Sequence, residues 1–106
     1  MKLLVTDNHT GEGKFPLFQK GTAVNNFTIV DEESHWYSCE IGGHSTYIPD
    51  TYVTDGFLVQ DYDPTEIIVK KGQEVDLIAI VFEWLYVKDE NGISGWLPSS
   101  KVISAS

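Results

Sequence analysis

An internal repeat of about 50 residues constrains the fold of this chain more than any other sequence feature. A glycine, a tryptophan, a proline and a valine recur after 51, 48, 49 and 49 residues, at Gly21 and Gly72, Trp36 and Trp84, Pro49 and Pro98, and Val53 and Val102. The small changes in offset indicate the same strands joined by loops of slightly different length. Since a β-propeller needs about four or more blades to close, two repeats predict two small closed units in tandem.

The segments inside each repeat have the patterns of β-strands. Side chains alternate between two faces over Trp36–Ile41, with Cys39 on the face expected to be buried. Gly42-Gly43 predicts a two-residue hairpin turn after this strand. Asn91-Gly92 predicts another turn, of type I′, because both central positions of that turn need positive φ. No segment has helical periodicity of useful length.

The sequence therefore predicts an all-β protein made of two small β-barrels in tandem, with about five strands each. We place the boundary between the two repeats, which gives barrels at residues 1–54 and 55–106, the first being the more divergent copy. The candidate linker, Thr54-Asp55-Gly56, is too short for free movement of one barrel against the other.

Charge limits the classes of partner. Sixteen acidic residues face seven basic ones, for a net charge of −9. Nucleic acids and anionic membrane surfaces both require clustered Lys and Arg, so neither is expected as a partner. The acidity fits a basic protein partner, or it serves only to keep the protein soluble.

Catalytic and metal-binding chemistry is not indicated. The three histidines, His9, His35 and His44, lack the short spacing of a helical His pair, and a zinc site needs three or four converging ligands. Cys39 is the only cysteine, so a disulfide within the chain is excluded, and we expect a buried, unreactive thiol. Nothing resembles a nucleophile elbow or a phosphate-binding loop. We expect no enzymatic activity, no cofactor and no metal.

Localisation is predicted from two observations. No apolar run approaches the roughly 20 residues of a membrane-spanning helix. The N-terminus reaches Asp7 too soon for the apolar region of a signal peptide. A cytoplasmic location is therefore expected for the chain as given, and an exported one if it is a domain of a larger secreted protein.

Residues 57–103 resemble a Src-homology-3 (SH3) domain over its full length. The matching segments are Leu58-Val59-Gln60-Asp61-Tyr62 for the opening strand, Ile67 to Glu74 for the central one, Trp84-Leu85 for the Trp-Trp strand, and Gly95-Trp96-Leu97-Pro98-Ser99-Ser100-Lys101-Val102 for the closing one. The first half matches less well, through Phe18-Gln19-Lys20-Gly21, His35-Trp36-Tyr37 and Tyr47-Ile48-Pro49-Asp50-Thr51-Tyr52-Val53. The short loop after Tyr62 and the tandem arrangement look more like the bacterial relatives of the family.

The resemblance implies a surface for peptides. Domains of this family hold proline-rich peptides, in polyproline II form, across ridges of aromatic and proline side chains. Carried over by position, the ligand-contacting residues are Tyr62, Trp84 and Pro98 in the second unit, and Trp36, Pro49 and Tyr52 in the first. Gln60 and Lys101, and in the first unit Thr6 and Asn8, replace the other ridge tyrosines.

Three acidic residues near this surface have alternative interpretations. Asp61, Asp63 and Glu66 lie on either side of Tyr62 and would form an acidic loop that attracts Arg or Lys of a peptide. The simpler interpretation is a solvated turn.

Three functions remain open at the level of sequence. The first is a non-catalytic adaptor that binds a basic or proline-rich protein or peptide. The second is recognition of bacterial cell-wall peptidoglycan, as in exported relatives of the family. The third is an acidic decoy for a basic, nucleic-acid-binding protein, or a self-associating structural protein. The sequence does not fix the oligomeric state.

Overall fold

The computed structural model describes residues 1–11, 13–29 and 33–105. The described residues form β-strands and two short 3-10 helices, and they contain no α-helix, so the predicted all-β class is confirmed. In chain order the elements are β1 (Lys2–Val5), β2 (Val24–Ile29), β3 (Trp36–Ile41), β4 (His44–Pro49), η1 (Asp50–Tyr52), β5 (Val53–Thr54), β6 (Phe57–Leu58), β7 (Glu74–Val81), β8 (Trp84–Lys88), β9 (Ser94–Pro98), η2 (Ser99–Lys101) and β10 (Val102–Ser104).

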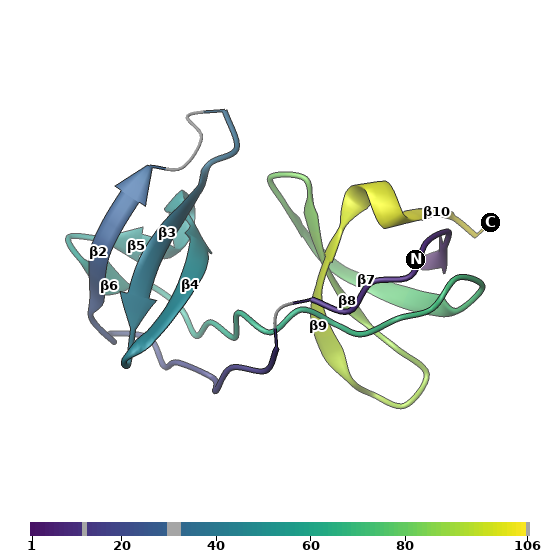
Figure 1. Cartoon of the computed structure of the whole chain (residues 1–106), viewed down its shortest axis with the longest axis horizontal. Helices are drawn as coiled ribbons and strands as arrows, with labels where there is room; N and C mark the ends of the chain where they lie inside the picture. Colours follow the sequence, from purple (N-terminus) through teal and green to yellow (C-terminus); the bar gives the residue numbers. More distant parts are fainter. Residues whose placement is uncertain (12, 30–32, 106) are drawn as a thin grey trace. The chain divides into compact units, whose positions relative to one another are not determined.

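The chain divides into two compact units, and unit 2 is inserted in the sequence of unit 1. Unit 1 comprises Met1–Lys14 and Thr65–Ser106, and unit 2 comprises Phe15–Pro64. The predicted division into residues 1–54 and 55–106 therefore differs from the units that the structure shows. The physical reason is that β1 forms its hydrogen bonds with the C-terminal strands, as Figure 1 shows for the purple N-terminal segment.

Unit 1 is built on a five-stranded antiparallel sheet in the order β10-β1-β7-β8-β9. Leu3 and Val5 alternate with more exposed residues along β1, so both point into the core. The core of this unit is a single apolar cluster formed by Leu3, Val5, Ile67, Val69, Val75, Leu85, Val87 and Leu97. Unit 1 therefore depends on β1 for part of its core.

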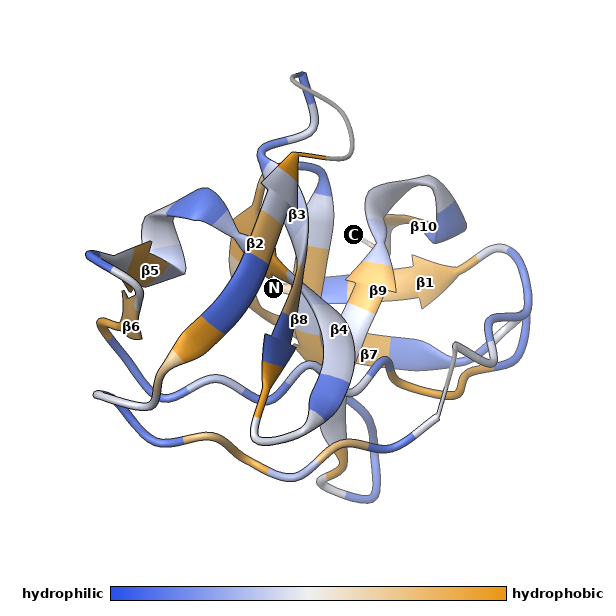
Figure 2. Cartoon of the chain, turned by 60° about the vertical axis from the view of Figure 1, so that its left-hand side comes forward, coloured by the Kyte–Doolittle hydropathy of each residue, from blue (hydrophilic) through white to orange (hydrophobic). Residues whose placement is uncertain are grey.

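Unit 2 contains a three-stranded sheet, β2-β3-β4, and a two-stranded pair, β5-β6. The predicted inward face of β3 is confirmed, because Cys39 and Ile41 are buried. Gly42 and Gly43 have φ of 57° and 82°, which confirms the predicted two-residue hairpin. In Figure 2 a hydrophilic stretch of β2 lies between hydrophobic residues before and after it in the strand. The register of β2 against β3 shifts between Asn25 and Thr28, where Asn26 has a φ of 52°.

The turn at Asn91-Gly92 differs from the prediction. Only Gly92 has positive φ, at 82°, so the expected type I′ turn is wrong. The backbone N–H of Asp89 donates to the carbonyl of Ile93 at 2.9 Å, which leaves a three-residue loop between them. The Asp89 carboxylate also accepts from the N–H groups of Asn91 and Ile93, both at 2.9 Å. This side chain satisfies donors inside the loop and so favours the longer turn.

Candidate functional site

The same pairing of tryptophan and proline occurs in both units. Trp36 opens β3 and lies opposite Pro49 on β4, and Trp84 opens β8 and lies opposite Pro98 on β9. A 3-10 helix follows the proline in each case, η1 in unit 2 and η2 in unit 1. Because successive side chains of a strand point to opposite faces, Trp84 lies on the face away from the core residue Leu85, and Trp36 lies on the face away from Tyr37. Both tryptophans are partly exposed.

The residue before each tryptophan holds the 3-10 helix in place. His35 and Glu83 both have left-handed backbone conformations, with φ of 60° and 71°. Their carbonyl oxygens accept hydrogen bonds from the N–H of Asp50 at 2.9 Å and of Ser99 at 3.0 Å, which are the first residues of η1 and η2. The two surfaces therefore have the same backbone support.

The surface in unit 1 consists of Trp84, Pro98, His9 and Glu66, and we call it the Trp84 surface. The ring of His9 lies edge-on to Trp84, with centroids 6.2 Å apart and planes at 71°. His9 Nε2 and Glu66 Oε1 are 2.7 Å apart. Trp84 and Pro98 are partly exposed. Sequence reasoning grouped Glu66 with a loop and did not include His9.

The surface in unit 2 is less open than predicted. Trp36 and Tyr52 are partly exposed, whereas Pro49 and Tyr62 are buried. The hydroxyl of Tyr62 donates to the carbonyl of Tyr47 at 2.6 Å, and its ring lies edge-on to Tyr52 with centroids 5.4 Å apart. Pro49 and Tyr62 thus support this surface from below and present little of it to a ligand.

Tyr62 lies in unit 2, and this corrects its predicted grouping with Trp84 and Pro98. In unit 1 the comparable place is held by His9, which follows Val5 by four residues as Tyr62 follows Leu58. Asp63 also lies in unit 2, partly exposed. The matching spacing after the two short apolar strands was the sequence signal that could have identified His9.

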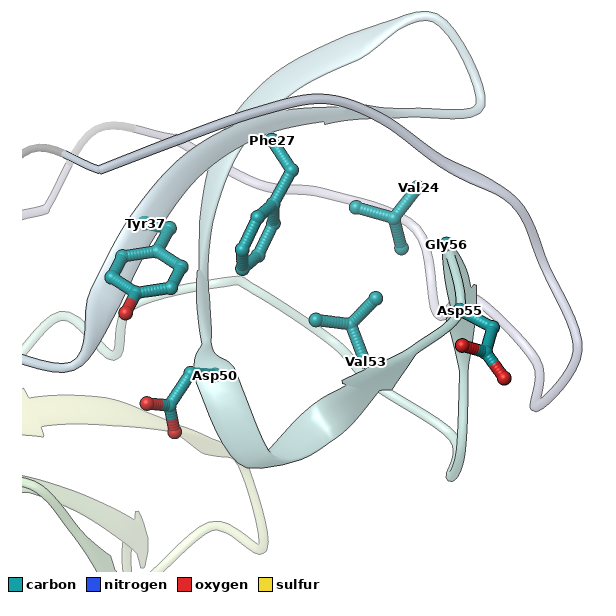
Figure 3. Close-up of a pocket in the computed structure, with 7 residues that line it drawn as sticks. All are labelled: Val24, Phe27, Tyr37, Asp50, Val53, Asp55 and Gly56. Atoms are coloured by element: carbon teal, nitrogen blue, oxygen red, sulfur yellow. The ribbon is translucent and has the colours of Figure 1, made fainter.

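Unit 2 also contains a pocket that sequence reasoning missed. Its volume is about 280 Å³, and it is lined by Val24, Phe27, Tyr37, Asp50, Val53, Asp55 and Gly56. The rings of Phe27 and Tyr37 pack edge to face, with centroids 4.6 Å apart. Figure 3 shows the apolar side chains facing one another, with Asp50 and Asp55 on opposite sides of the lining. The carboxylate oxygen Oδ2 of Asp50 also lies 3.0 Å from His35 Nδ1.

The described part of the chain offers little chemistry for catalysis. It contains no group of three or more His, Cys, Asp or Glu residues that could hold a metal ion. Cys39 is buried, and burial raises the pKa of its thiol to about 11, so the nucleophilic thiolate is scarce at neutral pH. Within the same described residues, no helix has the length and apolar character needed to cross a membrane.

Comparisons with protein-family models, with curated proteins and with solved structures find no match to this chain. The function is therefore argued from the geometry of the Trp84 surface, its counterpart in unit 2 and the pocket.

Proposed function

We propose that this protein is a non-catalytic binding module for a protein or peptide, built from two Src-homology-3-like β-barrels. The observation that carries the proposal is the partly exposed tryptophan beside a proline in both units. Large aromatic side chains dominate binding energy when a partner desolvates them. A proline-rich segment in polyproline II form fits between such side chains because its extended shape costs little conformational entropy on binding.

The proposal that each unit is a β-barrel is supported by the strands and the 3-10 helix that it contains. Unit 1 holds five strands and one 3-10 helix, namely β1, β7, β8, β9, η2 and β10, among its described residues. Unit 2 holds the same number, namely β2, β3, β4, η1, β5 and β6, among its own. In both, the 3-10 helix directly follows the strand that ends in proline and precedes a short strand, β5 in unit 2 and β10 in unit 1.

The charge of the chain indicates what accompanies the prolines in the partner. The net charge is −9, and Glu66 lies within the Trp84 surface. Long-range attraction therefore favours a partner segment with Lys or Arg beside its prolines. Such attraction is screened over about 8 Å at physiological salt, so binding should weaken as salt is added.

A peptide titration tests this proposal. The probe is a set of ten-residue peptides with a Pro-x-x-Pro core and a flanking Arg. Binding is measured from the change in tryptophan fluorescence of the protein. Trp84→Ala should weaken binding at least about tenfold, the size of loss expected for an aromatic anchor. Ile80→Ala, at a position 67% exposed on the neighbouring strand β7, is the matched control and should bind as the natural chain does.

The outcome that overturns the proposal is also defined. If Trp84→Ala and Trp36→Ala both remain folded by circular dichroism and bind every peptide with unchanged affinity, the tryptophans are not ligand contacts. A peptide that binds with the same affinity at low and high salt would contradict the preference for a basic segment.

A further inference from the structure

Equivalent backbone hydrogen bonds occur in the two units, and they come from different parts of the chain. In unit 1, Gly72 donates its N–H to the carbonyl of Val5 at 2.8 Å. In unit 2, Gly21 donates its N–H to the carbonyl of Leu58, also at 2.8 Å. Gly21 and Gly72 are matched positions of the sequence repeat. Val5 and Leu58 are therefore matched as well, and each is hydrogen-bonded within the unit formed mostly by the other half of the chain.

The same relation continues beyond the first strands. His9 and Val69 exchange two backbone hydrogen bonds in unit 1, both at 2.9 Å. Tyr62 and Phe18 exchange two in unit 2, at 2.8 and 2.9 Å. Residues 1–9 thus complete a unit made mostly of residues 65–105, and residues 57–62 complete a unit made mostly of residues 15–54. The first strands of the two halves are exchanged.

The exchange has a local cause in the short linker. Asp55 and Gly56 have φ of 53° and 83°, the pair of positive angles that a type I′ turn requires. This turn folds Phe57 back opposite Thr54, so β6 pairs antiparallel with β5. β6 is therefore held in unit 2, and its place in unit 1 is filled by β1.

One consequence of the exchange is that a glycine stands where unit 1 has a leucine. Leu3 lies opposite Val75 in unit 1, and Gly56 accepts a hydrogen bond from Val24 in unit 2 at 2.8 Å. Val24 and Val75 are matched positions. Leu3 is 5% exposed and belongs to the core cluster. Gly56 contributes no side chain, and the pocket of Figure 3 lies beside it.

The other lining residues support the same comparison. Val53 lines the pocket and pairs with Leu58, as Val102 pairs with Val5 in unit 1. Val102 packs against the cluster that contains Leu3. The space that Leu3 fills between two strands of unit 1 is thus open between the matched strands of unit 2.

We propose that this pocket binds a leucine-sized aliphatic side chain of a partner segment that carries Lys or Arg on either side of it. The matched space in unit 1 takes Leu3, which sets the size of the occupant. Asp50 and Asp55 flank the pocket and, with the net charge of −9, favour basic neighbours. The pocket is a different site from the Trp84 surface, and the inference rests on the proposed function only in that the ligand is a peptide.

A peptide titration followed by NMR tests the pocket. The probe is acetyl-Arg-Leu-Lys-amide, and the readout is the methyl signals of Val24 and Val53. These signals should shift on addition of the probe. Acetyl-Arg-Ala-Lys-amide should bind about tenfold more weakly or worse, because three buried carbons are lost. Acetyl-Glu-Leu-Glu-amide should not bind, and equal binding of all three peptides would overturn the proposal.

Matched substitutions separate the pocket from the rest of the molecule. Val53→Leu fills the pocket, so it should abolish the probe-induced shift of the Val24 methyl signals and raise the thermal midpoint. Val102→Leu, at the matched position beside Leu3, should leave probe binding unchanged and give no gain in midpoint because that space is already filled. A Val53→Leu variant that is folded and binds the probe normally overturns the proposal.

Trp84→Ala distinguishes this inference from the proposed function. It should leave binding of the Arg-Leu-Lys probe unchanged. If Trp84→Ala removes probe binding and Val53→Leu does not, the pocket is not the site, while the Trp84 surface remains a peptide site. If the Arg-Leu-Lys probe binds as predicted and no proline-rich peptide does, the pocket stands and the Trp84 surface fails.

A crosslinking experiment tests whether Leu3 itself occupies the pocket through the unexchanged pairing. Lys2 lies opposite Asp76, and Asn25 is the matched position in unit 2. Paired residues of an antiparallel ladder lie within disulfide reach. Oxidised Lys2→Cys/Asp76→Cys should form an intrachain disulfide, identified by mass spectrometry. An intrachain disulfide in Lys2→Cys/Asn25→Cys instead would place Leu3 in unit 2 and overturn the proposal.

Discussion

Gly95 shows how a single residue sets the distance between two segments of unit 1. A Cβ atom at this position would lie 2.7 Å from the backbone N of Ile67 and 2.9 Å from its Cβ. Ile67 is fixed there because its N–H donates to the carbonyl of Trp96 at 3.0 Å. Backbone atoms on one side and a buried strand on the other leave no flexible group that can move away.

Gly95→Ala is therefore expected to destabilise the protein by about 1–3 kcal/mol, the usual cost of overpacking a tight core. Urea unfolding measures the change. Ser100→Ala, an exposed substitution in η2, is the control and should change the free energy of unfolding by less than about 0.5 kcal/mol. A Gly95→Ala protein as stable as the natural chain would show that Ile67 moves without cost.

The buried side chain of Tyr62 makes one specific hydrogen bond through its hydroxyl group. Its hydroxyl is satisfied by the carbonyl of Tyr47 at 2.6 Å. Tyr62→Phe keeps the ring contact with Tyr52 and leaves that carbonyl without the donor, so it should cost about 0.5–1.5 kcal/mol. Thermal unfolding measures the loss. An unchanged midpoint would mean that water replaces the donor fully.

The thiol of Cys39 makes the stability of the protein depend on pH. Burial raises the pKa of the folded-state thiol from 9.0 to about 11. The unfolded chain therefore loses this proton first as pH rises, and the stability contributed by the neutral thiol is complete below pH 9 and declines between pH 9 and about 11. Cys39→Ala should lose stability less steeply than the natural chain over that window in urea unfolding. Equal slopes would contradict the raised pKa.

At the scale of elements, the turn between β7 and β8 stores strain. Phe82 and Glu83 have φ of 45° and 71°, the angles of a type I′ turn, without the Asn or Gly that such turns favour. A bulky side chain at positive φ costs of order 1–3 kcal/mol. The strand pairing of Val81 with Trp84 on either side maintains this conformation.

Replacing Phe82-Glu83 by Asn-Gly should raise the free energy of unfolding by about 1 kcal/mol, since the new residues adopt these angles without strain. The carbonyl at position 83 that holds η2 is a backbone group and is retained. Guanidinium unfolding provides the measurement. A decrease in stability would show that packing of the Phe82 ring outweighs the strain of its backbone.

The elements also show which local signals predict structure. Gly42-Gly43 predicted a two-residue turn correctly because two glycines adopt the positive φ angles of that turn without strain. Asn91-Gly92 is a stronger signal by composition, yet it gave the wrong turn because the Asp89 side chain bonds two N–H groups of the loop. The alternation of residues along β3 was enough to predict which of its faces is buried. The turn at Phe82-Glu83 lacks the Asn and Gly residues that favour positive φ, and the charge of Glu83 is the one turn signal that these two residues carry.

At the scale of the whole molecule, the sequence predicts strands and hairpins but not the pairings between distant segments. The tryptophan and proline of each surface were identified by their positions in the repeat and in the family resemblance, and each pair lies across one hairpin. His9 and Tyr62 reach their units through the exchange of first strands, which depends on pairings between residues far apart in sequence. The pocket was missed for the same reason, because it exists only where Gly56 replaces Leu3.

The exchange makes a prediction about fragments. Residues 15–64 contain all the strands of unit 2 and should fold alone, whereas residues 55–106, the domain predicted from sequence, lack β1 and the core residues Leu3 and Val5. In that fragment β6 is the one strand left to take the place of β1, and it would put Gly56 in the position of Leu3. Removing a buried leucine side chain costs about 2.7–5.0 kcal/mol. Both fragments are small and therefore marginally stable, but residues 15–64 keep the buried core residues of unit 2, whereas residues 55–106 lose Leu3 and Val5 and should not fold.

The dispersion of amide signals in NMR spectra distinguishes folded from unfolded fragments. Residues 1–14 joined to 65–106 by a Gly-Ser linker should give a folded spectrum, because this fragment regains β1 and its two core side chains. Leu3→Ala in the joined fragment should unfold it, while Lys2→Ala, which removes only an exposed ion pair with Asp76, should not. A folded and equally stable 55–106 fragment would show that β6 serves unit 1 as well as β1 does. The exchange would then follow from the Asp55-Gly56 turn alone and not from the fit of Leu3.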